Sequence, residues 1–265
     1  MQASCAKTES HGIGRSGCVR ENERQGVMQK AAAAAALTAV MVLIGGCSQE
    51  PPGRAPEIPK PAKTAVKPIT VLALGDSTTA GTPDFKSPVE APPEGEGNPE
   101  SQYAHWIRLK HPEWTVLNRG VNGERTDEIA ARFQKDLTLF SPDVVIVLAG
   151  VNDLYQGRTA DQILGELNKI YDMAEARKIR VMACTVLPYN TSTKPVRHQM
   201  MVLNQRIRGV AVNRNFLICD TYELLNDPVY PGKLIGTPDG LHPDVEGYRR
   251  MGEAIAAVLE TEYAL

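Results

Sequence analysis

The sequence predicts an α/β domain built on a doubly wound, five-stranded parallel sheet flanked by helices. Several short segments are apolar throughout rather than alternating, as expected for strands that are buried on both faces. Segments with helical spacing of their apolar residues lie between them, which favours crossover connections. The expected strands are residues 69–74, 114–117, 144–148, 179–185 and 216–219.

The expected helices follow from a 3.6-residue spacing of apolar side chains. Residues 129–140 and 163–171 each place their apolar residues on one face, and residues 198–212 and 245–260 are also amphipathic. Thr159 and Gln162 predict a capping box at the start of the second of these helices. Residues 81–101 break the pattern with five prolines and little periodicity. A loop of this length in a compact domain is usually functional or mobile.

The composition is that of a globular protein, with 42% hydrophobic and 23% charged residues in a chain of 265. It excludes a disordered tail, a collagen and a multi-span membrane protein. The formal net charge of −2 offers no basic surface for phosphates, so no nucleic-acid partner is expected. Five cysteines without a C-x-x-C pair are too few for a disulfide scaffold.

The N-terminal region carries an apolar run at residues 31–44. A bilayer span needs about 18–20 such residues, whereas a signal-peptide core needs about 7–15. The run is followed by Ile44-Gly45-Gly46-Cys47, which resembles the lipobox of bacterial lipoproteins. That resemblance implies cleavage before Cys47 and acylation of this cysteine, which would anchor the protein to a membrane. The alternative is a short buried helix that happens to end near a cysteine.

Three segments are therefore expected. Residues 1–46 form a signal peptide, in which 1–27 are an upstream extension if Met28 is the true start. Residues 47–68 comprise the lipidated cysteine and a linker with six prolines, which is stiff enough to hold the domain clear of the lipid and let it reach substrates near the membrane. Residues 69–262 form the domain. Because aspartate after the cysteine favours inner-membrane retention in Gram-negative lipoproteins, Ser48 predicts a periplasm-facing protein of the bacterial cell envelope, sorted to the outer membrane.

Polar residues cluster where the expected strands end, which is where doubly wound folds bind ligands. A serine hydrolase needs a nucleophile, a base, a carboxylate that orients the base, and donors for an oxyanion. All four parts are available on separate loops. These loops contain Gly75-Asp76-Ser77-Thr78, residues 118–123, Gly150-Val151-Asn152-Asp153, and Asp239-Gly240-Leu241-His242.

Each part also has a purely structural interpretation. Ser77 could be a helix N-cap, and Asn152 could cap a turn. Gly123 could simply supply a positive φ angle. Asp239 and His242 could be a surface pair, or could form a weak metal site with Asp244. Their joint occurrence in this order is much harder to explain by chance.

The four blocks resemble those of SGNH (GDSL-type) hydrolases over residues 69–260, with Thr78 where many members carry leucine or isoleucine. The resemblance implies a flavodoxin-like three-layer sandwich and a serine hydrolase without metal or organic cofactor. It assigns Ser77 as the nucleophile, His242 as the general base and Asp239 as its orienting acid. It implies an oxyanion hole made of the Ser77 and Gly123 backbone amides and the Asn152 side chain, with Gly120 as the alternative to Gly123.

The predicted activity is hydrolysis of a carboxylic ester of a small molecule, lipid or glycan through an acyl-enzyme. Stretches around Asn152 and His242 favour the lysophospholipase and thioesterase branch over carbohydrate deacetylases. An envelope O-acyltransferase with the same triad is an alternative, and an inactive glycan-binding lipoprotein is a remote one. The acyl chain, the leaving group and the oligomeric state are not encoded in these motifs.

Other residues give weaker signals. Packing is preferred for His105 and Trp106, and a pair of core thiols for Cys184 and Cys219. Tyr155 is expected to touch the acyl group. His111 and His198 have no evident partner in the sequence.

Overall fold

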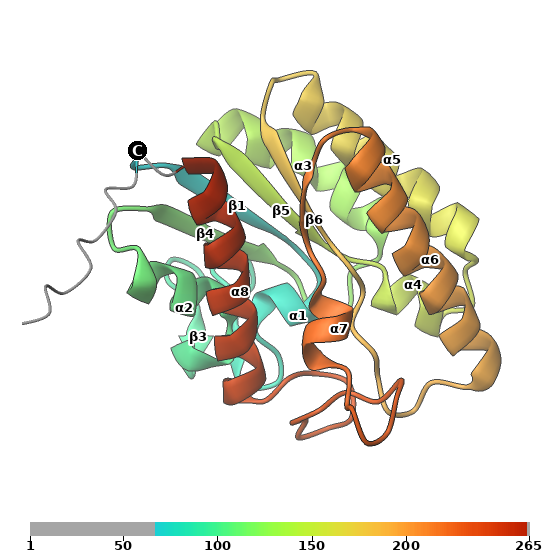
Figure 1. The fold of residues 1–265 in the computed structure, drawn as a ribbon. Helices are drawn as coiled ribbons and strands as arrows, with labels where there is room; N and C mark the ends of the chain where they lie inside the picture. The colour runs from blue at the N-terminus through green and yellow to red at the C-terminus, as the bar shows by residue number, and fades with distance from the viewer. Residues whose placement is uncertain (1–66, 264–265) are drawn as a thin grey trace, which may run out of the picture. The chain divides into compact units, whose positions relative to one another are not determined.

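The computed structural model describes residues 67–263. The expected signal peptide, the lipidation site Cys47 and nearly all of the linker lie outside the described residues. Within them, a five-stranded parallel sheet has the order β4-β1-β5-β6-β7 (Figure 1). Its strands are β1 (Thr70–Gly75), β4 (Thr115–Gly120), β5 (Val144–Leu148), β6 (Arg180–Cys184) and β7 (Leu217–Cys219).

The sheet confirms the predicted fold class. All four strand pairs are parallel, and the second sheet strand in the chain lies outside the first, which is the flavodoxin-like order. The strands are buried on both faces because alternate residues enter two separate cores. In β1, Leu72 and Leu74 pack into one core, while Val71 and Ala73 pack into the other.

Helices cover both faces of the sheet, as the amphipathic segments predicted (Figure 1). On one face, α3 (Thr126–Phe140), α5 (Ala160–Glu175) and α6 (Lys194–Asn213) bury their apolar stripes. The other face is covered by α2 (Tyr103–Lys110) and α8 (Val245–Tyr263). The predicted capping box is present, since Thr159 and Gln162 bond reciprocally at the start of α5. No helix among residues 67–263 has the length and apolar character needed to cross a bilayer.

Short elements that periodicity does not reveal complete the fold. They are α1 (Ser77–Ala80), α4 (Val151–Tyr155), α7 (Thr221–Leu225), and a 3₁₀ turn at Pro99–Ser101. Residues 81–101 contain a small antiparallel pair, β2 (Phe85–Lys86) with β3 (Glu96–Gly97), beside α2 in Figure 1. This segment is therefore structured rather than a featureless loop.

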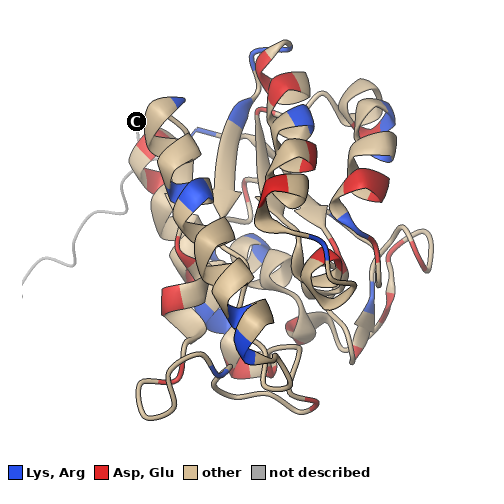
Figure 2. Cartoon of the chain, turned by 90° about the vertical axis from the view of Figure 1, so that its right-hand side faces the viewer, with Lys and Arg blue, Asp and Glu red and all other residues tan. Residues whose placement is uncertain are grey.

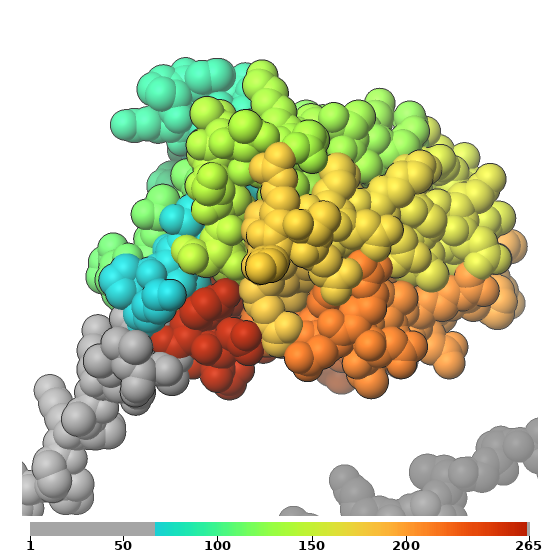
Figure 3. Space-filling view, turned by 90° about the horizontal axis from the view of Figure 1, so that it is seen from above, coloured from blue at the N-terminus to red at the C-terminus, as the bar shows by residue number. Residues whose placement is uncertain are grey.

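The described chain enters the domain at the edge opposite to the carboxyl ends of the strands. Lys67 N–H donates to Tyr263 O at the end of α8 (3.2 Å), and Trp114 Nε1 donates to Lys67 O (3.1 Å). Figure 3 shows the start of the described chain and the end of α8 side by side. From there β1 crosses the sheet to α1, so chain entry and α1 lie at opposite ends of β1 (Figure 1).

Lysine, arginine, aspartate and glutamate residues are interspersed along the helices on the face seen in Figure 2. Many of them pair locally, as Arg249 does with Glu246 and Glu253 on α8. Such exposed pairs typically stabilise a fold by less than about 1 kcal/mol each, so they add solubility more than stability.

Candidate active site

The turn from β1 into α1 places Ser77 at the carboxyl edge of the sheet. Gly75 is needed there because a Cβ would lie 2.2 Å from Leu148 O on the neighbouring strand. Asp76 is the N-cap of α1, and its Oδ1 accepts the Thr78 N–H (3.0 Å). Ser77 is therefore the first helical residue, with its backbone N–H at the unpaired start of the helix.

The loop that precedes α8 brings two further predicted residues to Ser77. His242 Nε2 lies 2.9 Å from Ser77 Oγ, and His242 Nδ1 lies 2.6 Å from Asp239 Oδ2. Asp239 Oδ1 also accepts the backbone N–H groups of Leu241 (2.9 Å) and His242 (2.8 Å), which fixes the turn between acid and base. The three side chains thus form one hydrogen-bonded chain, with Ser77 and His242 buried.

Two carboxyl groups near the serine have pKa values shifted in opposite directions. Partial burial acts to raise the pKa of Asp239, but hydrogen bonds from His242 and from backbone amides outweigh it and hold the pKa at about 2. Asp239 is therefore ionised at neutral pH beside the imidazole. Burial raises the pKa of Asp76 to about 7, although its bond from Thr78 opposes that rise. Asp76 serves the helix cap rather than the histidine, so Asp239 is the group that can orient the base.

The residues expected to bind an oxyanion lie on the next two strand ends. Asn152 is the second residue of α4, which follows β5. Its Nδ2 donates to Glu124 O (2.9 Å) in the loop after β4. This bond ties Asn152 to the residue that follows Gly123. Gly123 has φ +81°, and its N–H makes no hydrogen bond within residues 67–263.

The backbone N–H of Gly120, the alternative oxyanion donor, already makes a hydrogen bond within the protein. Its N–H donates to Asn118 Oδ1 (2.9 Å), and a Cβ there would lie 2.1 Å from Ala80 N. Gly120 therefore lets β4 pack tightly against α1. Of the two glycines, Gly123 is the one whose N–H is available to a ligand.

Two charged residues, to which the sequence assigned no role, hold the loops at the carboxyl ends of the strands together. Asp153 is fully buried and accepts bonds from Thr126 and Arg158, which ties α4 to the start of α3. Arg132 of α3 donates to Gly75 O (3.1 Å) and to the Glu124 carboxylate (2.7 Å), joining the end of β1 to the Gly123 loop. Asp153 belongs to the Gly150–Asp153 block of the sequence, whereas Arg132 belongs to no short motif that would have indicated its role.

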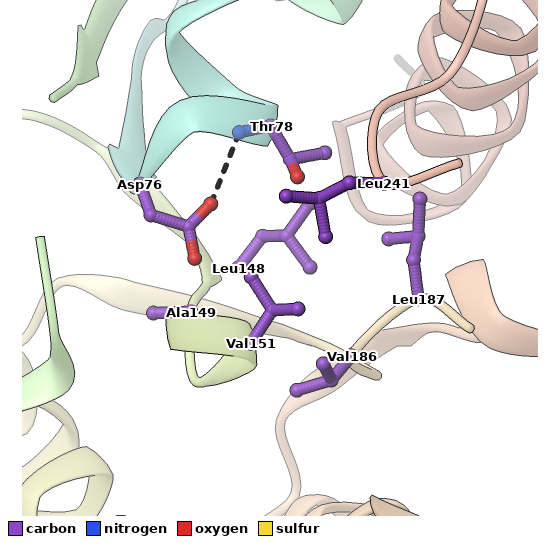
Figure 4. Close-up of a pocket in the computed structure, with 8 residues that line it drawn as sticks. All are labelled: Asp76, Thr78, Leu148, Ala149, Val151, Val186, Leu187 and Leu241. Atoms are coloured by element: carbon purple, nitrogen blue, oxygen red, sulfur yellow. Dashed lines mark hydrogen bonds between the residues drawn. The ribbon is translucent and has the colours of Figure 1, made fainter. Parts of the chain in front are cut away.

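A small cavity lies among the sequence neighbours of the candidate site residues. Its volume is about 10 Å³, close to the minimum that holds one water molecule. Figure 4 shows aliphatic side chains from separate segments surrounding it, beside Asp76. Its lining comprises Asp76, Thr78, Leu148, Ala149, Val151, Val186, Leu187 and Leu241. Tyr155, which was expected to touch an acyl group, does not line this cavity and is 70% exposed.

The remaining candidates have structural roles. Trp106 packs against the core under α8, and Cys184 and Cys219 are free, buried and paired in register across β6 and β7. His111 bonds both Glu113 (2.8 Å) and Glu260 (2.7 Å). Asp244, a candidate metal ligand with Asp239 and His242, caps the start of α8 through Gly247 N–H. Residues 67–263 contain no cluster of three or more His, Cys, Asp or Glu side chains suited to a metal ion.

Known proteins resemble this chain over most of the described domain. The GDSL-like lipase/acylhydrolase family model matches residues 73–250. An acetylxylan esterase from Geobacillus stearothermophilus is 23% identical over 73% of the chain and 94% of its own length. An acetylxylan esterase from Xylanibacter ruminicola is 27% identical over 77% of the chain, but over only 45% of its own length.

Solved structures show the same fold. A member of the lipolytic G-D-S-L family from Veillonella parvula aligns with a TM-score of 0.61 at 18% identity, over 71% of this chain and 97% of its own. A carbohydrate acetylesterase from Sinorhizobium meliloti aligns with a TM-score of 0.57 at 17% identity, over 73% and 99%. Both matches span nearly the whole of the solved chain, so little of that fold is missing here.

Proposed function

Since the chain belongs to the GDSL-like lipase/acylhydrolase family and is an ester-hydrolysing enzyme, we propose that it removes acetyl groups from carbohydrate hydroxyls. The observation that carries the proposal is the Ser77–His242–Asp239 hydrogen-bonded chain, whose chain neighbours Asp76, Thr78 and Leu241 line a cavity of about 10 Å³. The curated relatives are acetylxylan esterases, which favours the carbohydrate deacetylase branch over the lysophospholipase and thioesterase branch that the stretches around Asn152 and His242 resemble.

The mechanism follows from the hydrogen bonds. Ser77 Oγ attacks the ester carbonyl while His242 Nε2 takes its proton. Asp239, ionised at neutral pH, holds the Nδ1–H and stabilises the imidazolium. The oxyanion receives the Ser77 and Gly123 N–H groups and the second Nδ2 hydrogen of Asn152. His242 then protonates the leaving alkoxide and activates the water that cleaves the acyl-enzyme.

The size of the cavity argues for a short acyl group. A space that holds about one water molecule fits the methyl of an acetyl group, whereas a longer chain would collide with Val186, Leu187 or Leu241. Close-packed interiors resist such insertion, and accommodating extra methylenes typically costs about 1–3 kcal/mol. We therefore expect p-nitrophenyl acetate to be hydrolysed faster than the butyrate and octanoate.

A Val186→Ala variant should change this preference. The Val186 backbone is pinned by Asn204, whose side chain bonds its N–H (2.7 Å) and its carbonyl (2.9 Å), so truncation should enlarge the cavity rather than move the chain. We expect the butyrate-to-acetate ratio of kcat/KM to rise by about tenfold, the factor that about 1.4 kcal/mol of relieved overlap provides. Initial rates on the p-nitrophenyl series measure it.

Val181→Ala is the matched control. Val181 belongs to the same hydrophobic core but does not line the cavity, so its truncation should lower stability without changing the ratio. An unchanged ratio in Val186→Ala would contradict the acyl-pocket assignment. A wild-type enzyme that prefers octanoate would instead support the lysophospholipase and thioesterase alternative.

The proposed location is the bacterial cell envelope, with a lipid on Cys47 as the membrane anchor. The described chain enters at the edge of the sheet opposite to Ser77, beside the end of α8. The linker of residues 47–68 would hold the domain clear of the lipid and let it reach ester substrates near the membrane.

A Cys47→Ala variant should lose the lipid and leave the esterase unchanged, because the described domain starts 20 positions later at Lys67. Mass spectrometry of the mature N-terminus and fractionation of the envelope measure the two effects. Ser48→Ala is the control, since it leaves the acylated residue intact. A wild-type protein whose mature N-terminus lies upstream of Cys47 and carries no acyl group would contradict the lipoprotein assignment.

A further inference from the structure

The segment of residues 81–101 is fixed to the loop that carries Gly123. Ser87 is fully buried, and its hydroxyl donates to Gly120 O (2.6 Å). Glu90 Oε1 accepts the Asn122 N–H (2.9 Å), while its Oε2 accepts the Ser87 N–H (3.1 Å). One half-buried carboxylate thus joins the segment to the residue immediately before Gly123.

The residue after Gly123 is also held. The Glu124 carbonyl accepts a bond from Asn152, and its carboxylate accepts one from Arg132. Gly123 itself has nothing within 4 Å of the position that a Cβ would occupy, so packing does not fix it. The direction of the Gly123 N–H therefore depends on hydrogen bonds to its two neighbours, namely those at Asn122 and Glu124 and the turn bond from Glu124 N–H to Val121 O (3.3 Å).

We propose that Glu90 is a positioning residue that orients the Gly123 N–H toward the oxyanion. This inference rests on the proposed function, because it requires Gly123 to be an oxyanion donor. Such donors act by being held in place before charge develops, and a displacement of about 1 Å can cost about 100-fold in rate. A carboxylate that accepts two backbone N–H groups makes charge-assisted bonds, which are stronger than neutral ones. The segment of residues 81–101 would thereby help to position the oxyanion donor Gly123.

Glu90→Ala tests the proposal in the full-length protein. The oxyanion exists only in the transition state, so we expect kcat on p-nitrophenyl acetate to fall by about 10- to 100-fold, with KM changed by less than about twofold. Glu90→Gln keeps a carbonyl oxygen that can accept the Asn122 N–H, and it should stay within about threefold of wild type. Glu94→Ala, an exposed acidic residue of the same segment, is the matched control and should be unchanged.

Hydrogen exchange provides a readout that does not depend on turnover. Amides of residues 120–124 should exchange faster in Glu90→Ala than in Glu94→Ala. Wild-type kcat in Glu90→Ala, equal rates for Glu90→Gln and Glu90→Ala, or unchanged exchange would each overturn the proposal. A wild-type enzyme inactive on acetyl esters would instead refute the proposed function, and the exchange result would still decide whether Glu90 holds the loop.

Discussion

A Ser77→Ala variant is expected to lose about 10⁴- to 10⁶-fold in kcat while keeping its fold, because the nucleophile is removed and the oxyanion donors remain. Ser77 Oγ has His242 Nε2 as its partner, and the cap of α1 comes from Asp76 instead. The substitution therefore deletes one hydroxyl without uncapping the helix. Rates on p-nitrophenyl acetate and the melting temperature measure the two effects.

Covalent labelling separates this role from an indirect one. An organophosphonate probe should add to Ser77 in the wild type and to no residue in the variant, as intact mass and peptide mapping would show. Ser101→Ala is the matched control, since its buried hydroxyl has no hydrogen-bond partner within the described residues. Turnover that survives in Ser77→Ala would end the serine-hydrolase assignment.

The sheet could be predicted from sequence because its strands are buried on both faces and therefore apolar throughout. The prediction ended the second strand three residues early, at residue 117, whereas β4 continues to Gly120. The reason is that Asn118 is buried but polar, and bonds Ala80 O (3.0 Å) and Gln102 (2.8 Å). A hydrophobic pattern cannot show a polar side chain that is satisfied by tertiary contacts.

The candidate site was predictable where its residues occur in short blocks. Ser77, Asp239 and His242 could be named because they stand in short blocks that resemble those of SGNH hydrolases, and the structure brings them into hydrogen-bond contact. Glu90 could not be named, since it acts on Asn122, 32 residues away, through a backbone N–H that any residue would present. One-turn helices such as α1 and α4 are likewise too short to show periodicity.

An Asp239→Asn variant should lose about 10⁴-fold in kcat at neutral pH, because it forces the wrong histidine tautomer. Asp239 Oδ1 accepts two backbone N–H groups, so the asparagine oxygen must stay there and its NH₂ must face His242 Nδ1. Nδ1 then becomes an acceptor, and the proton sits on Nε2, where it blocks the bond from Ser77. Asp244→Asn is the control, since Asp244 caps α8 without touching His242.

The ionisation of Asp239 gives the stability of the fold a pH dependence of defined sign. With a pKa of about 2, Asp239 keeps its charge throughout the range in which histidine titrates, near pH 6.5. Asp239 therefore contributes no ionisation of its own to the kcat/KM profile between pH 5 and 8. The native pKa also lies below the usual value of 3.8, so this group stabilises the fold above about pH 4 and loses that contribution as the pH falls toward 2. Between pH 4 and 2 the melting temperature of the wild type should therefore fall more steeply than that of Asp239→Asn, and parallel curves would mean that Asp239 makes no such contribution.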